Sequence, residues 1–385
     1  MNLRTETVIA NARIVTPEAV IDGGAVVLDR DGRIAAVDPD GSRAPGAVDL
    51  DGDYLVPGLV ELHTDNLEKH FAPRPGVRWP GLAATVGHDW QVITAGITTV
   101  YDAITVGETV LGGDRLANLQ AMVDSVATAW ARGMLRSEHR LHLRCEVSHA
   151  STVQLFERLV EEPLVELVSL MDHTPGQRQF TSFETYRRYY LKKFHFTDEE
   201  FAIFVERQAA AHKLHSGPNR ATIVAQAKAR GYTLASHDDA TPEHVEEAAA
   251  AGMRIAEFPT TVEAAELSRR HGMQILMGAP NVVRGGSHSG NVSALDLARR
   301  GLLDILSSDY VPGSLIQSAF QLAATIEQIT LPQAVAMVTR NPARAVGLDD
   351  RGEIAAGRRA DLVRIREIDG LPLVQAVWRG GERII

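Results

Sequence analysis

The sequence predicts an α/β fold in which a TIM-like (β/α)8 barrel carries a small β-sandwich built from both ends of the chain. Three observations lead to this prediction. Both termini consist of short segments rich in β-branched residues, the region between them alternates apolar strands with helical segments, and polar side chains recur where those strands end. Alternating strands and helices are typical of a parallel sheet, and polar strand ends are typical of a barrel that carries a site.

The two ends of the chain are predicted to fold together. Near the N-terminus, β-like segments at 8–10, 13–15, 24–28 and 33–37 are separated by Asp-Gly pairs that are typical of turns. Segments at 361–365 and 376–385 have the same character. We expect residues 1–56 and 343–385 to form one composite β-sandwich domain, and residues 57–342 to form the barrel.

The middle of the chain contains eight apolar segments with the length of strands, at 54–62, 96–102, 141–147, 164–171, 232–236, 254–258, 274–278 and 303–308. Helical patterns separate them, among them 116–132, 198–214 after an N-cap at Thr197, 241–252, and a helix that opens at Ser293. This rhythm fits a (β/α)8 barrel. A doubly wound open sheet is the alternative, although no glycine-rich phosphate loop follows the first strand.

Composition argues against several classes of protein. The 385 residues are 45% hydrophobic and carry a formal net charge of −10, which disfavours binding to nucleic acid or to an anionic membrane. No apolar run is long enough to cross a bilayer, and the N-terminus lacks the apolar core of a secretory signal. Because Cys145 is the single cysteine, we expect a cytoplasmic protein without internal disulfides.

Side chains that bind metals gather at the predicted strand ends. His63 and Asp65 lie two residues apart at the end of the first strand, so both point to the same side. Because the carboxyl ends of all barrel strands meet at one face, we predict a shared site for a divalent metal. Any one of these residues alone is more commonly an ordinary polar group. The predicted ligands are His63, Asp65, Glu146, His173, His237 and Asp309.

Imidazole and carboxylate ligands suit zinc, and they leave manganese or iron open. The set suffices for one ion or for two. Two ions about 3.5–4 Å apart, bridged by a carboxylate and a hydroxide, would supply a nucleophile near neutral pH. Asp309, at the end of the last strand, is the predicted catalytic residue, because it could orient that hydroxide and accept its proton. Metal and base together predict hydrolysis.

Cationic side chains follow three of the same strand ends, in the segments 63–79, 173–179 and 278–291. Exposed backbone N–H groups and guanidinium groups bind phosphate oxygens. Three such loops in an acidic protein favour a polyphosphorylated small molecule, although a flexible surface loop is the simpler interpretation of any one of them. The predicted substrate contacts are Lys69, His70, Arg74, Arg78, Arg178, Asn281, Arg284 and His288.

Several strings in the chain resemble a known family. NPARAVGL at 341–348 and RGEIAAGRRADLV at 351–363 are similar to the amidohydrolase superfamily. Further strings are similar to one of its members, the diphosphatase family of the carbon–phosphorus lyase pathway. These strings are HTDNLEKH (63–70), RPGVRW (74–79), MDHTPGQRQF (171–180), SHDDAT (236–241) and GAPNVVRGGSHSGNVSA (278–294). The resemblance covers essentially the whole chain.

The resemblance implies a metal-dependent hydrolase barrel that acts in phosphonate catabolism. Its implied substrate is α-D-ribose 1-methylphosphonate 5-triphosphate, which water cleaves to diphosphate and α-D-ribose 1-methylphosphonate 5-phosphate. A homodimer is implied as well. The superfamily commonly has His-x-His on its first strand, where this chain has Asp65 in the second place, as the diphosphatase family does. The usual bridging carboxylated lysine and the histidine of the sixth strand are absent, so we expect Glu146 to bridge and His173 to compensate.

Two other functions remain open at this point. An amidohydrolase that cuts a cyclic amide or an N-acyl group would have a neutral pocket, and it would leave the basic loops without a role. A non-catalytic, metal-binding partner of the phosphonate-degrading complex would bind other proteins and show no turnover.

Overall fold

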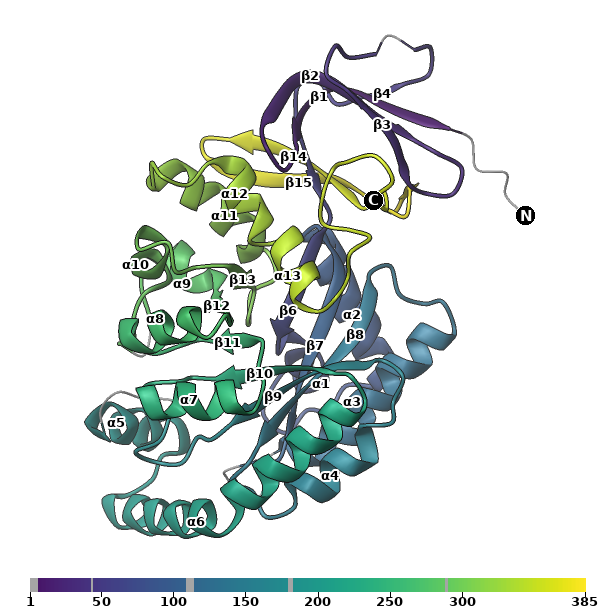
Figure 1. The fold of residues 1–385 in the computed structure, drawn as a ribbon. Helices are drawn as coiled ribbons and strands as arrows, with labels where there is room; N and C mark the ends of the chain where they lie inside the picture. Colours follow the sequence, from purple (N-terminus) through teal and green to yellow (C-terminus); the bar gives the residue numbers. More distant parts are fainter. Residues whose placement is uncertain (1–5, 43, 109–113, 179–182, 288–289) are drawn as a thin grey trace.

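The computed structural model describes residues 6–42, 44–108, 114–178, 183–287 and 290–385. A sheet formed by both ends of the chain lies at one end of the molecule, and a barrel of parallel strands with surrounding helices forms the rest (Figure 1). The chain passes directly from β5 (Tyr54–Pro57) in the terminal sheet to β6 (Leu59–Thr64) in the barrel. The barrel strands therefore begin beside the terminal sheet, and their carboxyl ends point away from it.

The barrel is a nearly closed cylinder of eight parallel strands in the order β13-β12-β11-β10-β9-β8-β7-β6. Each of the eight predicted strands overlaps one of them. An isolated parallel bridge between Thr64 and Asp309 joins the carboxyl ends of β6 and β13. Inward-pointing side chains such as Leu62, Tyr101 and Leu167 fill the interior. The remaining strands are β7 (Ile97–Val106), β8 (Glu138–Glu146), β9 (Val165–Met171), β10 (Thr233–His237), β11 (Ile255–Glu257), β12 (Gln274–Gly278) and β13 (Ile305–Ser307).

Helices lie between successive strands and cover the barrel. Among the described residues, no helix combines the length and the apolar character that crossing a membrane requires. The helices are α1 (Asn66–Phe71), α2 (Gly81–Thr94), α3 (Asp114–Ala131), α4 (Thr152–Leu159), α5 (Phe183–Phe194), α6 (Asp198–Ala229), α7 (Pro242–Ala250), α8 (Val262–Arg270), α9 (Ala279–Arg284), α10 (Ala294–Arg299), α11 (Ser314–Thr325), α12 (Leu331–Ala336) and α13 (Arg340–Ala345).

The terminal sheet interleaves the two ends of the chain, in the order β16-β15-β14-β5-β1-β2-β3, with β4 paired to β1. Most pairs are antiparallel, but β1 pairs in parallel with β4 and β5. Its core contains Ile14, Leu55 and Trp378, so residues from both termini pack on one another. The other strands are β1 (Thr7–Val15), β2 (Val20–Leu28), β3 (Ile34–Asp38), β4 (Val48–Asp49), β14 (Leu362–Ile368), β15 (Leu371–Arg379) and β16 (Glu382–Arg383).

The first predicted strand, 54–62, is wrong as a single element, because the chain changes sheets at Gly58. Pro57 ends β5, and the N–H of Gly58 donates to the carbonyl of Asp361 at 2.7 Å. A Cβ atom at position 58 would lie 2.3 Å from the Thr98 hydroxyl oxygen. Only glycine fits this approach, so the Pro-Gly pair divides two strands that hydrophobicity alone merges.

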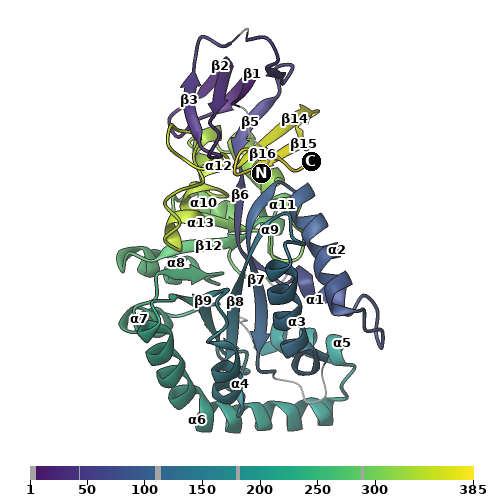
Figure 2. The ribbon, with the colours of Figure 1, turned by 90° about the vertical axis from the view of Figure 1, so that its right-hand side faces the viewer.

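Two helical boundaries also differ from the sequence prediction. Helix α6 begins after the Thr197 N-cap as predicted, but it continues through Pro218 to Ala229 instead of ending near 214. Pro218 removes one backbone donor, yet Asn219, Ile223 and Ala227 beyond it are buried and keep the helix on the barrel. Figure 2 shows this long helix at the end of the molecule farthest from the terminal sheet. The predicted loop 278–291 begins instead with the short helix α9.

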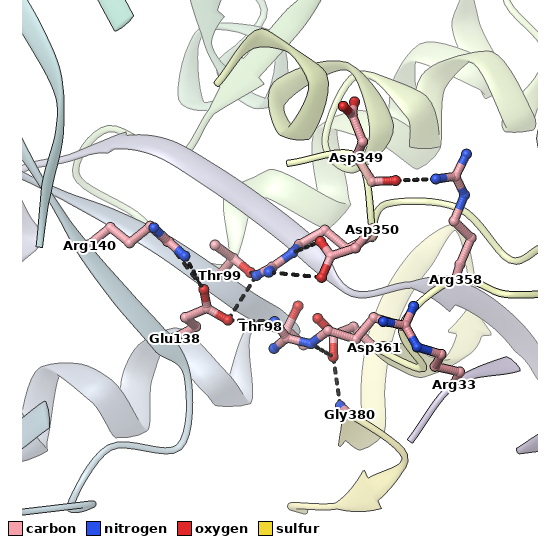
Figure 3. A network of polar contacts seen from close by, with 12 residues as sticks. Arg33, Thr98, Thr99, Glu138, Arg140, Asp349, Asp350, Arg358, Asp361 and Gly380 are labelled. Atoms are coloured by element: carbon pink, nitrogen blue, oxygen red, sulfur yellow. Dashed lines mark hydrogen bonds and ion pairs between the residues drawn. The ribbon is translucent and has the colours of Figure 1, made fainter. Parts of the chain in front are cut away.

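A polar network holds the terminal segments against the start of the barrel (Figure 3). The carboxylate of Glu138, at the first residue of β8, accepts hydrogen bonds from Arg140, Arg351 and Arg359. Arg351 also donates to the Thr99 hydroxyl at 2.9 Å. Since Arg351 and Arg359 belong to the segment that leads into β14, this network fixes the C-terminal segment to the start of the barrel. The carboxyl ends of the barrel strands lie on the opposite face.

Candidate metal centre

The carboxyl end of the barrel contains a cavity of about 180 Å³ that brings predicted site residues from distant strands together. His63 at the end of β6, His237 at the end of β10 and Asp309 after β13 all line it. Asn281 and Arg284 on α9 form part of its wall. Five predicted residues therefore meet in one cavity, although more than 240 positions separate His63 from Asp309 in the sequence.

His63 and His237 lie face to face and share one carboxylate. Their ring centroids are 5.5 Å apart with an interplanar angle of 17°. Nδ1 of His63 lies 3.1 Å from Oε1 of Glu257, and Nδ1 of His237 lies 3.1 Å from Oε2 of the same residue. A carboxylate that accepts from Nδ1 fixes the tautomer in which Nε2 carries the lone pair. Both rings are thus prepared to offer Nε2 to a metal.

The electrostatics of this pair favour neutral imidazoles. Burial holds the pKa of His63 and of His237 well below the ordinary value, and the neutral ring is the form that binds metals. Burial acts to raise the pKa of Glu257, but His142 and the hydrogen bond from His237 outweigh it, so that the pKa is lowered. Glu257 is therefore a carboxylate when both rings are neutral donors.

A second group forms around His173, which follows β9. Its Nδ1 lies 2.7 Å from Oε2 of Glu146, and its backbone N–H donates to Oε1 of the same carboxylate at 3.2 Å. Its Nε2 lies 3.9 Å from Asp238, which is also 3.7 Å from Nε2 of His237. The ligand atoms of His173, His237 and Asp238 all lie within 4.8 Å of one another, as do those of His63, His142 and Glu257.

Asp65 and Asp309 meet where the cylinder closes. The N–H of Asp65 donates to the carbonyl of Asp309, and the N–H of Asp309 donates to the carbonyl of His63, each at 3.1 Å. The carboxylate of Glu61 reinforces this seam by accepting from the N–H groups of His63 and Ser308. Burial, together with the neighbouring charge of Asp65, raises the pKa of Asp309 to about 7. Two acidic groups thus share a confined position beside the histidines.

The residues present fit a divalent metal. Oδ1 of Asp65 is buried and has no hydrogen-bond partner in the described part of the chain, which is costly for a carboxylate oxygen unless a cation approaches it. Burial also raises the pKa of Asp238 to about 7, as expected for a carboxylate that lacks its counter-ion. Nitrogen and oxygen donors of this kind match zinc and related first-row metals.

Backbone strain occurs at the same place. Asp238, Phe258 and Asp309 directly follow strand ends or lie one residue beyond them, and each has a positive φ, of 58°, 53° and 53°. Left-handed backbone is unfavourable for residues other than glycine and concentrates at functional sites. The strained residues coincide with the carboxyl end of the barrel. This coincidence supports the cavity there as the functional site.

Several predicted phosphate contacts lie outside the cavity wall. Lys69 donates to the carbonyl of Tyr310 at 2.6 Å, and His70 lies 3.0 Å from the amide oxygen of Gln91. Arg74 and Arg78 are exposed in the segment after α1. Arg178 is buried, with its guanidinium paired to Asp239 and Glu247. His288 lies outside the described residues.

Sequence reasoning missed Glu257, Asp238 and Arg144. Asp238 follows a predicted ligand, and Glu257 lies in a predicted strand near its end. The strand-end rule, by which site residues of a barrel lie at the carboxyl ends of its strands, therefore applies to both. Arg144 precedes Glu146 by two residues on β8, and period-two alternation places both on the inner face. Arg144 lines the cavity beside His237.

Known proteins are similar to this chain over most of its length. The model of the amidohydrolase family matches residues 127–384. The chain is 52% identical over 378 residues to the α-D-ribose 1-methylphosphonate 5-triphosphate diphosphatase of Escherichia coli (strain K12), covering 98% of this chain and 100% of that one.

Two solved structures show the same fold at low identity. The 5-methylcytosine deaminase from Klebsiella pneumoniae, liganded with phosphonocytosine, is 16% identical with a TM-score of 0.65, covering 98% of each chain. The N-acetyl-D-glucosamine-6-phosphate deacetylase from Mycobacterium smegmatis is also 16% identical with a TM-score of 0.65, covering 99% of this chain and 100% of that one.

Proposed function

Because the chain belongs to the amidohydrolase family, and is 52% identical to a diphosphatase within it, we propose that it hydrolyses the same substrate as that relative. The substrate is α-D-ribose 1-methylphosphonate 5-triphosphate, and the products are diphosphate and α-D-ribose 1-methylphosphonate 5-phosphate, a step in phosphonate catabolism. The identity over 98% of the chain is the observation that carries this proposal. Imidazoles and carboxylates that converge at the barrel mouth support it.

The residues that would hold the metal come from four strands or the segments that follow them: His63, Asp65, Glu146, His173 and His237, with Asp238 as an addition from the geometry. We propose zinc, with manganese or iron as alternatives, and one or two ions. When bound, such a metal supplies a Lewis acid for phosphoryl oxygens and lowers the pKa of water.

Asp309 is the residue that we assign to the water nucleophile. The oxygen of water forms a bond to phosphorus, and the anhydride bond to the departing diphosphate breaks with its electron pair remaining on the leaving oxygen. The proton of the water passes to the Asp309 carboxylate, which lines the cavity. Arg284 and Asn281 on α9 also line the cavity and are available to hold phosphate oxygens.

We also propose the finer architecture that the sequence predicts. The barrel is of the TIM-like (β/α)8 type of metal-dependent hydrolases and spans 57–342, and residues 1–56 with 343–385 form the composite β-sandwich domain. A homodimer and a cytoplasmic location complete the proposal.

One experiment separates this function from the alternatives. Metal-loaded protein is incubated with the ribose phosphonate triphosphate, and with ATP for comparison, while inorganic diphosphate is measured. We expect stoichiometric diphosphate and loss of turnover when a chelator removes the metal. Release of ammonia or an amine from cyclic or N-acyl amides, without diphosphate from triphosphates, would reject the proposal in favour of an amidohydrolase. No turnover of either class would favour a binding partner.

A further inference from the structure

Two arginines on β8 point to the inside of the barrel but have different surroundings. Arg140 and Arg144 are four residues apart on one strand, so their side chains lie on the same face. Arg140, nearer the start of the strand, pairs with Glu138 and Glu166. Arg144, nearer the metal centre, forms no ion pair with any carboxylate in the described part of the chain. Nη2 of Arg144 lies 3.5 Å from Nε2 of His237.

The guanidinium of Arg144 is also partly cut off from water. The residue is only half-buried overall, yet its Nε atom is buried and lacks a hydrogen-bond partner. Leaving a donor of a charged group without a partner is costly. His237 does not neutralise it, because an imidazole carries no negative charge. Arg144 is therefore a cation that faces the cavity without a carboxylate at ion-pair distance in the described part of the chain, although its charge acts on Asp238, Glu257 and Asp309 from farther away.

Metal binding would increase this imbalance. Asp238 in the cavity wall, and Asp65 and Glu146 next to the wall residues His63 and His237, are carboxylates that a divalent ion would engage. The positive charge of Arg144 would then remain beside further positive charge. An anionic ligand would balance this positive charge, since it can contact the metal and the guanidinium together.

We propose that Arg144 binds the anionic oxygens of the phosphoryl group held at the metal centre, and that it thereby selects a phosphoanhydride over a neutral amide. The inference rests on the proposed function. A planar guanidinium offers two parallel N–H donors to a phosphate. A neutral amide in the same place would leave the cation unpaired, and sites of this kind discriminate strongly against ligands that cannot satisfy them.

Arg284 has a different role in the same cavity. It lies on α9, where its side chain is exposed at the rim, whereas Arg144 lies on a barrel strand beside His237. Arg284 can contact phosphates that extend toward solvent. Arg144 is fixed by the strand at the reacting end. Loss of Arg144 is therefore expected to affect the chemical step, and loss of Arg284 mainly binding.

The test uses metal-loaded full-length protein and inorganic diphosphate as the probe, with affinity measured by calorimetry and kcat/KM measured on the triphosphate. Arg144→Ala is expected to weaken diphosphate binding and to lower kcat/KM by ~100-fold, with metal content unchanged. Arg144→Gln, which keeps most of the side-chain length, is expected to do the same and decides the matter where the alanine variant fails to fold. Arg230→Ala removes an equal charge from the surface pair with Glu161 and is expected to behave as wild type.

The outcomes distinguish the role of Arg144 from the proposed function. Arg144→Gln with wild-type diphosphate affinity and wild-type kcat/KM would overturn the role of Arg144 while leaving the proposed function intact. Failure of the wild-type protein to release diphosphate from the triphosphate would instead overturn the proposed function.

Discussion

The carboxylate of Glu257 accepts a hydrogen bond from Nδ1 of His63 at 3.1 Å, and it does so from the strand that lacks the expected histidine. Its second oxygen binds His237 in the same way. One buried residue thus fixes the ring orientation of two proposed ligands. Partners of this kind are commonly as necessary to a metal site as the ligands themselves.

Glu257→Gln should therefore weaken metal binding while the barrel stays folded, because an amide can accept only one of the two hydrogen bonds and carries no charge. We expect metal affinity to fall roughly 10–100-fold, measured by competition with a chromogenic chelator. Glu246→Gln makes the same chemical change in a surface pair with His271 and serves as the control. Equal metal retention by both variants would contradict the orienting role of Glu257.

Asp309→Asn should separate catalysis from folding. The substituted amide keeps the shape of the side chain but cannot accept a proton, so kcat should fall ~100-fold or more with little change in KM. The measurement is steady-state diphosphate release by protein whose metal content matches wild type. Asp296→Asn, in an exposed pair on α10, is the control. Wild-type turnover by a folded, metal-loaded Asp309→Asn variant would remove Asp309 from the mechanism.

The strand-end rule accounts for what the sequence could predict. Apolar strands followed by His, Asp or Glu located the cavity and placed His63, His237 and Asp309 in its wall, because a barrel gathers all strand ends at one face. The same rule did not identify Glu257 as a partner of both rings. The family pattern has a histidine on that strand, and the sequence alone does not show that the carboxylate of Glu257 contacts both histidine rings from the same place.

Cationic loops were harder to interpret, because the sequence does not show which cations already have partners. Arg178 lies in a predicted phosphate loop, but Asp239 and Glu247 neutralise it inside the protein. Arg144 lies on a strand, so a search of loops for cationic residues does not find it. Among the described residues, it forms no ion pair with a carboxylate. Whether an arginine serves structure or ligand depends on tertiary pairing across distant segments, which only the folded chain reveals.

Arg284→Ala tests the cavity wall provided by α9. The side chain reaches the cavity from the exposed end of a short helix, so its removal should lose phosphate contacts without disturbing the metal ligands. We expect KM to rise roughly tenfold with kcat nearly unchanged. Initial rates over a range of triphosphate concentrations provide the measurement. Arg299→Ala, on the exposed side of α10, should leave KM unaltered, and an unaltered KM for Arg284→Ala would show that α9 holds no phosphate.

Glu138 provides a prediction about stability that is independent of the metal. Burial alone would raise its pKa, but Arg351 and Arg359 hold that pKa far below the ordinary value. A depressed carboxyl pKa stabilises the folded state above the ordinary pKa of about 4.3, and this contribution is lost progressively as the pH falls below it. Glu138→Gln should thus lower the free energy of unfolding by about 2–3 kcal/mol near neutral pH.

The difference between wild type and Glu138→Gln should shrink below about pH 4, since protonation of Glu138 then removes the same charge from the wild-type protein. Urea unfolding at several pH values measures it. Glu161→Gln breaks an exposed pair with Arg230, and it should cost under about 0.5 kcal/mol at any pH. A Glu138 effect that is equally small, or that does not depend on pH, would mean that the network in Figure 3 does not anchor the C-terminal segment to the barrel.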